Sequence, residues 1–366
     1  IIGYMYSKWV QSWRDLPILI VQWGSVMRWE IRTKLFLRTA EFYWHEGHTA
    51  HADADEALEE MYRILDIYEK FCLEEAAIPV FKGPKSESER FPGAQITTSI
   101  EAMMWDKRAL QSGTSHYFGT NFAKAFDIKF LNKKNELQFA ETTSWAISSR
   151  IIGAMIMVHG DDHGLVLPPR LAPIQAVVVP IFKNDDEKTK VMEVADRVFA
   201  ELKAAGIRIK MDDRDNVSSG FKFNDWEMRG VPVRVEIGPK DVEKGSVALA
   251  RRDKPGREGK TFVSQTGLSS TVSLLLSEIQ DSLLKRATEY RDANIHEPKD
   301  YEDLKRIVAD GWAFAYWCES LECEAKVKEE AKATTRNIPM NQPDQEGVCI
   351  VCGRPSKRKV YFARAY

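Results

Sequence analysis

Four of the five cysteines have spacings that suit a metal ion. Cys318 and Cys323 are separated by four residues, and Cys349 and Cys352 by two, with Gly353 allowing the chain to turn after the last one. Thiolates in two short-spaced pairs suit tetrahedral zinc. Since the protein would fill all four ligand positions, the sequence predicts a structural zinc site.

Arg28 and Arg38 lie in two segments that predict strands, SVMRWEI (25–31) and FLRTAEF (36–42). As antiparallel neighbours these strands would bring both guanidinium groups to one place. Guanidinium groups bind phosphate oxygens and stay charged, and Phe42 could stack on a flat ring. The alternative is a solvated strand edge with ordinary ion pairs, and these residues alone leave both interpretations open.

Histidines form two further groups that resemble metal sites. His45, His48 and His51 are three residues apart, a spacing that would bind a metal on a helix. His159 and His163 flank Gly-Asp-Asp, which we interpret as a turn because it directly precedes the predicted strand GLVLP (164–168).

Composition limits the classes of protein. The 366 residues predict two or three domains, and a formal net charge of −2 excludes a chain that binds nucleic acid through its overall charge. The longest apolar run (151–158) is too short to span a bilayer. An odd number of cysteines, most near the C-terminus, favours a reducing compartment, and we expect the cytoplasm.

The first half of the chain predicts an α+β domain. The chain opens in what reads as the middle of a helix, so we expect an upstream part of the protein. PILIVQW (17–23) predicts a strand, and Asp53 and Asp55 open a long helix whose apolar positions extend to Cys72, a buried thiol. Residues 95–105 predict a strand or helix, and residues 145–158 are mostly helical.

From residue 173 the pattern changes to strand–helix–strand alternation. Strands are expected at 175–182, 207–211, 231–237 and 246–252, with helices at 185–205, 217–228 and 271–287. This pattern predicts a compact α/β domain. The cysteines follow in a last, smaller α+β domain, which gives boundaries of 1–172, 173–282 and 283–366.

The two arginine segments together resemble motif 2 of class II aminoacyl-tRNA synthetases, and GLVLPPR (164–170) resembles motif 3. Longer strings, EFYWHEGHTAHADADEA, QSGTSHYFGTNFAKAFDIKF and MVHGDDHGLVLPPRLAP, are similar to prolyl-tRNA synthetase of the archaeal and eukaryotic type. The resemblance covers nearly the whole chain. It implies an antiparallel class II catalytic fold, a homodimer, and ATP-dependent proline activation followed by transfer of the prolyl group to tRNA(Pro).

The resemblance also implies roles for individual residues. Arg28 and Arg170 would be catalytic, Arg28 on the α-phosphate and Arg170 with Arg38 on the outer phosphates. The ATP site would comprise Arg28, Glu30, Arg38, Thr39, Phe42, Gln111, Thr114, Arg150 and Arg170. The proline site would comprise Trp44, Glu46, His48, Phe91 and His116, with Thr114 beside it. Magnesium would arrive with ATP, and positioning would carry the reaction.

The second domain resembles the anticodon-binding module of the family, through FNDWEMRGVPVRVEIGPK (223–240). The resemblance implies that Glu227, Arg234 and Lys240 read anticodon guanines, which chemistry permits because a carboxylate accepts from guanine N1–H and arginine or lysine donates to O6 and N7. The alternative is that Arg234 and Glu236 only pair with each other. At the end of the chain, relatives of this type return their terminal tyrosine to the catalytic domain, and Tyr366 is expected to brace the active site.

Two parts of the family pattern are missing from the sequence: the Pro-Thr-Ser-Glu loop and motif 1, which builds the dimer. An incomplete record explains this most simply. The alternative function is a non-catalytic tRNA-binding paralogue, which would be free to lose the ATP and proline residues that are retained here.

Overall fold

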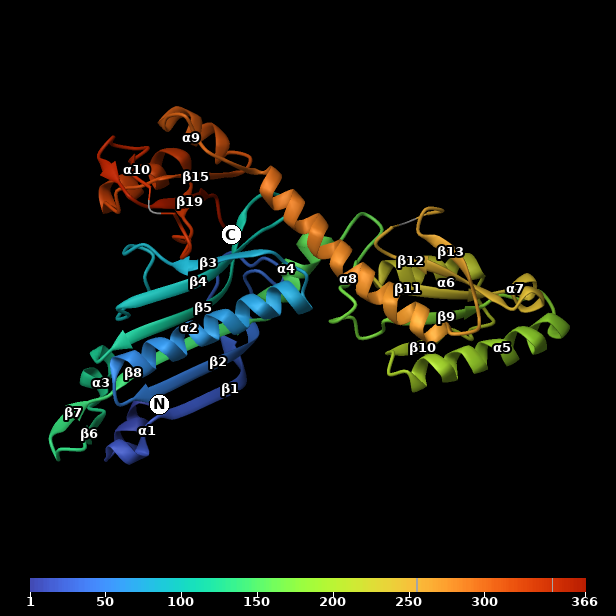
Figure 1. Ribbon diagram of the computed structural model, residues 1–366, viewed down its shortest axis with the longest axis horizontal. Coiled ribbons are helices and arrows are strands. Elements are labelled where there is room, and N and C mark those ends of the chain that lie inside the picture. The colour runs from blue at the N-terminus through green and yellow to red at the C-terminus, as the bar shows by residue number, and fades with distance from the viewer. Residues whose placement is uncertain (255, 344) are drawn as a thin grey trace. The chain divides into compact units, whose positions relative to one another are not determined.

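The computed structural model describes residues 1–254, 256–343 and 345–366, which form two compact units. The first unit comprises residues 1–73, 79–154 and 289–366, and the second comprises residues 74–78 and 155–288 (Figure 1). None of the helices in the described ranges is long and apolar enough to cross a membrane.

A six-stranded antiparallel sheet dominates the first unit, in the order β1-β2-β8-β5-β4-β3. Its strands are β1 (Ile18–Met27), β2 (Glu41–His51), β3 (Val80–Pro84), β4 (Ile96–Met103), β5 (Ala109–Gly119) and β8 (Glu141–Ser148). The unit also contains α1 (Ile2–Trp9), α3 (Asn121–Phe126), the hairpin of β6 (Lys129–Leu131) and β7 (Leu137–Phe139), and residues 150–154 of α4 (Arg150–His159). The sheet is antiparallel, as the sequence predicted.

Helix α2 (Ala54–Lys70) lies along one face of this sheet (Figure 1). It begins where the sequence predicts, because the side chain of Asp53 accepts a hydrogen bond from the amide of Glu56. Its apolar side buries Met61 and Leu65, and Cys72 after its end is also buried. Burial raises the pKa of the Cys72 thiol to about 12, which agrees with the expected inert core cysteine.

The predicted strands around the arginines are partly wrong. β1 ends at Met27 and β2 begins at Glu41, so Arg28–Ala40 form a connection rather than two strands. Hydrogen bonds from the amide of Arg28 to Ala40 and between Lys34 and Arg38 close this connection on itself. The sequence has strand composition there, but the ladder between β1 and β2 ends at the Met27–Glu41 pair, and Lys34 and Arg38 form only an isolated bridge.

Two other predictions of secondary structure are also corrected. Residues 145–148 belong to β8, so the helix expected from Trp145 begins only at Arg150. Residues 164–168 do not form a strand: Leu165 and Leu167 donate single hydrogen bonds to Met228 and Gly230, which is too irregular for a ladder.

The second unit has a mixed five-stranded sheet, β10-β9-β11-β12-β13, in which β9 pairs parallel with β10 and β11. The strands are β9 (Ala176–Pro180), β10 (Ile209–Met211), β11 (Val233–Ile237), β12 (Ser246–Arg251) and β13 (Lys260–Ser264). The helices are α5 (Asp185–Ala204), α6 (Ser219–Met228), α7 (Pro239–Lys244) and α8 (Leu268–Ala293), of which residues 268–288 belong to this unit. Apolar residues of α5 and α8 pack with valines of β9 and β11 in one cluster, whereas Trp226 of α6 packs with Val177 and Val179 in another.

The C-terminal part of the first unit has its own sheet, β14-β15-β19-β16. Its elements are β14 (Ile295–His296), α9 (Tyr301–Ile307), β15 (Trp312–Tyr316), α10 (Leu321–Ala331), β16 (Thr334–Thr335), β17 (Gly347–Val348), β18 (Pro355–Ser356) and β19 (Lys359–Ala363). Tyr361 of β19 stacks on Phe81 of β3 with ring centroids 4.2 Å apart. The small sheet therefore packs against the edge of the large one.

Candidate functional site

A cavity of about 360 Å³ opens on the face of the large sheet. β2 supplies Phe42, Trp44, Glu46 and His48 to its wall. Side chains of a strand alternate between faces, so these four residues share one face while His45 and Gly47 point to the other. The alternation explains how four residues of one short segment can line the same cavity.

The sheet register brings in the remaining predicted residues. Gln111, Thr114 and His116 come from β5, and Arg150 comes from the start of α4. Phe91 enters from the loop before β4, with its ring centroid 4.8 Å from that of His116. The cavity thus collects every residue predicted for proline and five predicted for ATP: Arg28, Phe42, Gln111, Thr114 and Arg150.

Arg28 lies at the mouth of this cavity over two aromatic rings. Its guanidinium carbon is 5.3 Å from the ring centre of Phe42 and 5.6 Å from that of Trp44. Arg150 is held more firmly, because its Nε and Nη1 donate to the carbonyls of Leu37 and Gln111 at 2.9 and 3.3 Å. Burial, and then the charge of Arg38, lower the pKa of Arg150. The guanidinium groups of Arg38 and Arg150 are therefore close enough to repel each other, as expected in a site that binds an anion.

Acidic and imidazole groups line the other side of the cavity. His48 Nε2 is 3.2 Å from Glu46 Oε1, and Gln22 donates to Glu46 Oε2 at 2.7 Å. Burial opposes ionisation of Glu46, but these hydrogen bonds lower its pKa overall. Burial, and then the charge of Lys85, lower the pKa of His116 to about 4, so its imidazole is neutral at pH 7.

Several lining residues were missed in the sequence. Trp145 of β8 belongs to the lining, but its indole packs on Gly47 of β2, on the face turned away from the cavity, where a side chain on Gly47 would come within 2.0 Å of it. Lys85, Glu89 and Thr97 also line the cavity. A signal existed for Lys85 and Glu89, which stand in a charged loop between two strands, but only the register shows that they face the cavity.

The histidine triplet is not a metal site. His45, His48 and His51 lie on a strand rather than a helix, so a spacing of three places neighbours on opposite faces. His45 Nδ1 bonds the hydroxyl of Tyr68 at 3.1 Å, and His51 Nδ1 lies 3.0 Å from Glu56. In the described ranges, the cysteines are the only group whose ligand atoms converge.

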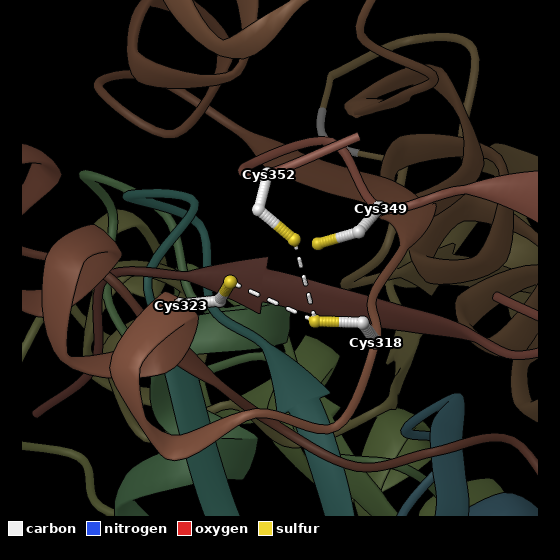
Figure 2. Close-up of side chains that lie close together, drawn as sticks. All are labelled: Cys318, Cys323, Cys349 and Cys352. Atoms are coloured by element: carbon white, nitrogen blue, oxygen red, sulfur yellow. Dashed lines mark hydrogen bonds between the residues drawn. The ribbon is translucent and has the colours of Figure 1, made fainter. Parts of the chain in front are cut away.

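The four cysteines Cys318, Cys323, Cys349 and Cys352 point toward one another, with Sγ atoms within 4.8 Å (Figure 2). The Cys318 Sγ atom is 3.6 Å from those of Cys323 and Cys352. A tetrahedral zinc with bonds of about 2.3 Å needs sulfurs about 3.8 Å apart, so the cluster has suitable dimensions for such a metal. Arg354 Nε donates to Cys352 Sγ at 3.3 Å and lowers the pKa of that thiol to about 6.

Comparisons with known proteins agree with this geometry. Sequence profiles match in order: "tRNA synthetase class II core domain (G, H, P, S and T)" at 2–159, "Anticodon binding domain" at 175–266, and "Prolyl-tRNA synthetase, C-terminal" at 301–366. Proline--tRNA ligase of Roseiflexus castenholzii is 56% identical over 367 residues, which cover 100% of this chain and 76% of the relative. The Deinococcus radiodurans enzyme is 50% identical over 374 residues, covering 100% and 74%.

The chain belongs to the prolyl-tRNA synthetase family. A solved structure agrees: the prolyl-tRNA synthetase of Cryptosporidium parvum complexed with L-proline and AMP has a TM-score of 0.95 at 39% identity, covering 100% of this chain and 79% of its own.

Other predicted residues of this prolyl-tRNA synthetase chain lie outside the cavity lining. Glu30, Arg38 and Thr39 belong to the connection between β1 and β2, where Arg38 Nη1 is 3.9 Å from Glu30 and the Thr39 hydroxyl donates to the carbonyl of Glu41. Arg170 belongs to the second unit, where its Nη1 is 3.3 Å from Glu75.

The predicted anticodon residues lie on and beside β11. Arg234 donates to Glu227 at 3.0 Å and to Glu236 at 2.9 Å, and its guanidinium carbon is 4.1 Å from the Phe223 ring. Glu236 also accepts from Lys260 at 2.6 Å. Lys240 is exposed on α7. The Arg234–Glu236 pair therefore exists, but the two residues do not pair only with each other, since Arg234 also bonds Glu227 and Glu236 also bonds Lys260.

Tyr366 ends the chain beside β5. Its amide donates to the carbonyl of Ala109, its hydroxyl donates to Asp106, and Lys34 lies 4.1 Å from the ring centre. The terminal residue is thus bound to the sheet and to the connection that contains Arg38.

Proposed function

We propose that this chain activates L-proline with ATP and transfers the prolyl group to tRNA(Pro). The observation that carries the proposal is the cavity on the large sheet, where arginines, aromatic rings and a Glu46–His48 pair meet in a member of this family. The relatives and the solved neighbour carry the corresponding names.

In this mechanism the carboxylate of proline attacks the α-phosphate and pyrophosphate leaves. The residues of the chain position the reactants and neutralise charge rather than transfer protons. Arg28 would meet the α-phosphate, Arg38 and Arg170 the outer phosphates, and Phe42 the adenine. Glu30, Thr39, Gln111, Thr114 and Arg150 would complete the ATP site. Magnesium would enter with the triphosphate.

The proline ring would lie against Trp44, Phe91 and His116. The neutral state of His116 supports this position, because an uncharged imidazole edge can pack against the apolar ring of proline. Glu46 and His48 would supply the polar contacts. The aromatic residues would therefore enclose the proline ring, and the arginines would bind the phosphates of ATP.

The direct test is ATP–pyrophosphate exchange with the protein that contains this chain. Exchange should depend on proline, and amino acids that differ from proline in shape should not support it. Failure of purified, folded protein to exchange in the presence of proline would falsify the proposal.

We propose three domains: residues 1–172 for catalysis, 173–282 for the anticodon, and 283–366 for zinc. Support for the middle domain comes from the ion pairs around Arg234, which a guanine edge could replace. Glu227 and Lys240 would contribute the neighbouring contacts. We further propose that the chain is of the archaeal and eukaryotic type, and support for this comes from the cysteine-bearing segment that follows the anticodon domain.

We further propose that Cys318, Cys323, Cys349 and Cys352 hold zinc. The donor set fits, since four sulfurs within 4.8 Å of one another could fill all four positions of a tetrahedral zinc and leave no open position for a substrate. The ion would stabilise the fold of the C-terminal part, and Arg354 would offset part of the negative charge of the four thiolates.

A homodimer in the cytoplasm completes the proposal. Support for the dimer comes from edge strand β1 and the residues after it, where Trp23, Met27 and Trp29 are at least 80% exposed. Contiguous exposed apolar side chains mark interaction surfaces. Sedimentation of the protein should give twice the mass of one chain. Tyr366 would brace the floor of the active site through β5 and the arginine connection.

A further inference from the structure

A buried ion pair joins the C-terminal part of the chain to the large sheet. Arg336 follows β16 and is 5% exposed, and Glu101 lies on β4 and is completely buried. Arg336 Nη2 and Nε donate to Glu101 Oε2 at 2.8 and 3.2 Å, and Nη1 donates to Thr334 at 2.8 Å. A buried pair of this kind is strongly sensitive to loss of one partner, because the other charge stays buried.

The second oxygen of Glu101 faces toward the cavity wall. Glu101 Oε1 accepts from the Ser99 hydroxyl at 3.0 Å and lies 3.9 Å from Lys85 Nζ. Lys85 does not bond Glu101 at this distance. Instead its ammonium group donates to Gln111 Oε1 at 2.7 Å, and Glu89 lies 3.7 Å away. Lys85, Glu89 and Gln111 line the cavity.

The backbone holds Arg336 rigidly against the sheet. Its amide donates to the carbonyl of Tyr361, and the amide of Ile338 donates to the carbonyl of Pro84. Asn337 Nδ2 donates to the carbonyl of Phe81 at 2.7 Å. A side chain on Gly83 would come within 1.9 Å of the Ile338 carbonyl, so only glycine allows this approach. Arg336 is therefore fixed with respect to Glu101.

We propose that Arg336 is a positioning residue for proline activation: it holds Glu101 so that Lys85 stays bonded to Gln111 in the cavity wall. This inference rests on the proposed function. It makes the C-terminal part of the chain a support of the ATP side of the cavity, in addition to its own metal site.

The physical reason is competition for a buried carboxylate. Without Arg336, the buried Glu101 carboxylate loses its cationic partner, and among the described residues Lys85, 3.9 Å away, is the cation left beside it. Lys85 would turn from Gln111 to Glu101, because a buried charge without a partner costs several kcal/mol while one hydrogen bond contributes about 1 kcal/mol. Gln111 would then lose the contact that fixes its amide.

The test compares three variants of the full protein in ATP–pyrophosphate exchange. Arg336→Met should raise the KM for ATP at least fivefold and change the KM for proline less than twofold. Glu101→Gln alone should leave the KM for ATP within twofold, since Lys85 has no new carboxylate to approach. Glu101→Gln in the Arg336→Met background should return the KM for ATP to within twofold of the parent.

Arg306→Met is the matched control, because Arg306 lies in the same C-terminal part and forms an exposed pair with Asp303. It should change neither KM. Arg336→Lys keeps the charge and should lie between the parent and Arg336→Met, and it replaces Arg336→Met if that variant does not fold.

Two results would overturn the inference. One is a KM for ATP that is unchanged in Arg336→Met, or in Arg336→Lys as its substitute. The other is an increase that Glu101→Gln does not reverse. A purely structural role would lower the thermal transition without this ATP-specific pattern. If the parent protein itself lacks proline-dependent exchange, the proposed function fails instead, so the two failures are distinguishable.

Discussion

Arg28 and Arg234 show two different uses of arginine in one chain. Arg28 is exposed and lies over the rings of Phe42 and Trp44, and the described residues place no carboxylate within 4.0 Å of it. The side chain of Arg234 is only 13% exposed and bonds both Glu227 and Glu236. The N–H donors of Arg28 are thus available to a ligand, whereas those of Arg234 are already bonded to carboxylates.

The difference sets what each residue can do with a ligand. A phosphate can meet Arg28 without breaking any ion pair, so the full interaction is available to the reaction. A guanine edge can reach Arg234 only by replacing a carboxylate, so the net gain from RNA is smaller. Substitutions should therefore affect catalysis and tRNA recognition to very different extents.

The largest expected effect is that of Arg28→Ala on proline-dependent ATP–pyrophosphate exchange. Removing a preorganised charge from the reacting phosphate should lower kcat by about 100-fold or more. Arg14→Ala, which removes an exposed arginine that contacts Trp13, is the control and should keep normal exchange. Normal exchange in Arg28→Ala would remove the contrast between the two arginines.

The cysteine cluster extends the comparison to a site whose donors would all be engaged by one ion. We expect about one zinc per chain in freshly purified protein, and Cys349→Ser should lose the zinc and lower the thermal transition. Cys72→Ser, which changes the buried cysteine outside the cluster, should keep it. Metal analysis that finds no zinc while all four thiols are free would contradict the assignment.

Arg234→Ala should weaken charging of tRNA while leaving proline activation nearly intact. A base contact contributes about 1–3 kcal/mol, which corresponds to a loss of roughly 5- to 150-fold in aminoacylation. Lys260→Ala is the matched control, because Lys260 shares Glu236 with Arg234 and has no proposed contact with a base. Equal losses in both variants would mean that Arg234 only organises the carboxylates.

Buried histidines in the two units allow a smaller test. Burial is the main cause that lowers the pKa of His116 in the first unit and of His159 in the second, each from 6.5 to about 4. The folded state keeps both neutral, so their stabilising contribution is present above pH 6.5 and is lost as the pH falls toward 4. Lowering the pH from 7.5 to 5.5 should cost about 1 kcal/mol per histidine.

The measurement is the thermal transition at the two pH values. His159→Gln should reduce the acid-induced shift, whereas His163→Gln, at an exposed histidine nearby, should leave the shift as in the parent. An identical shift in the parent and His159→Gln would show that His159 does not contribute.

The smallest effect is expected from deletion of Tyr366. The ring contacts Lys34 and the hydroxyl bonds Asp106, so its loss should loosen the arginine connection and lower proline activation a few-fold. Zinc content and the thermal transition should stay nearly unchanged. Tyr4→Ala, at an exposed tyrosine, provides the control. Unchanged activation after the deletion would mean that the terminus only packs.

Local patterns in the sequence were sufficient for several elements. The acidic start and apolar spacing predicted the helix after Asp53, and the helix expected at 185–205 is α5 (Asp185–Ala204). The cysteine pairs predicted a cluster, and the structure brings their sulfurs together. These features depend on residues a few positions apart or on ligand chemistry, and both are readable along the chain.

Only the tertiary structure decided which residues face the cavity and what holds them there. Trp145 read as part of a helix because its neighbours are apolar, but a central position between β2 and β5 makes its segment a strand. The spacing of His45, His48 and His51 left a metal site open as an alternative, and β2 excludes it by placing neighbouring histidines on opposite faces. Arg336 and Glu101 are 235 positions apart. No local pattern specifies such a pair, because sheet register and the packing of distant segments arise only when the whole chain buries its apolar surface.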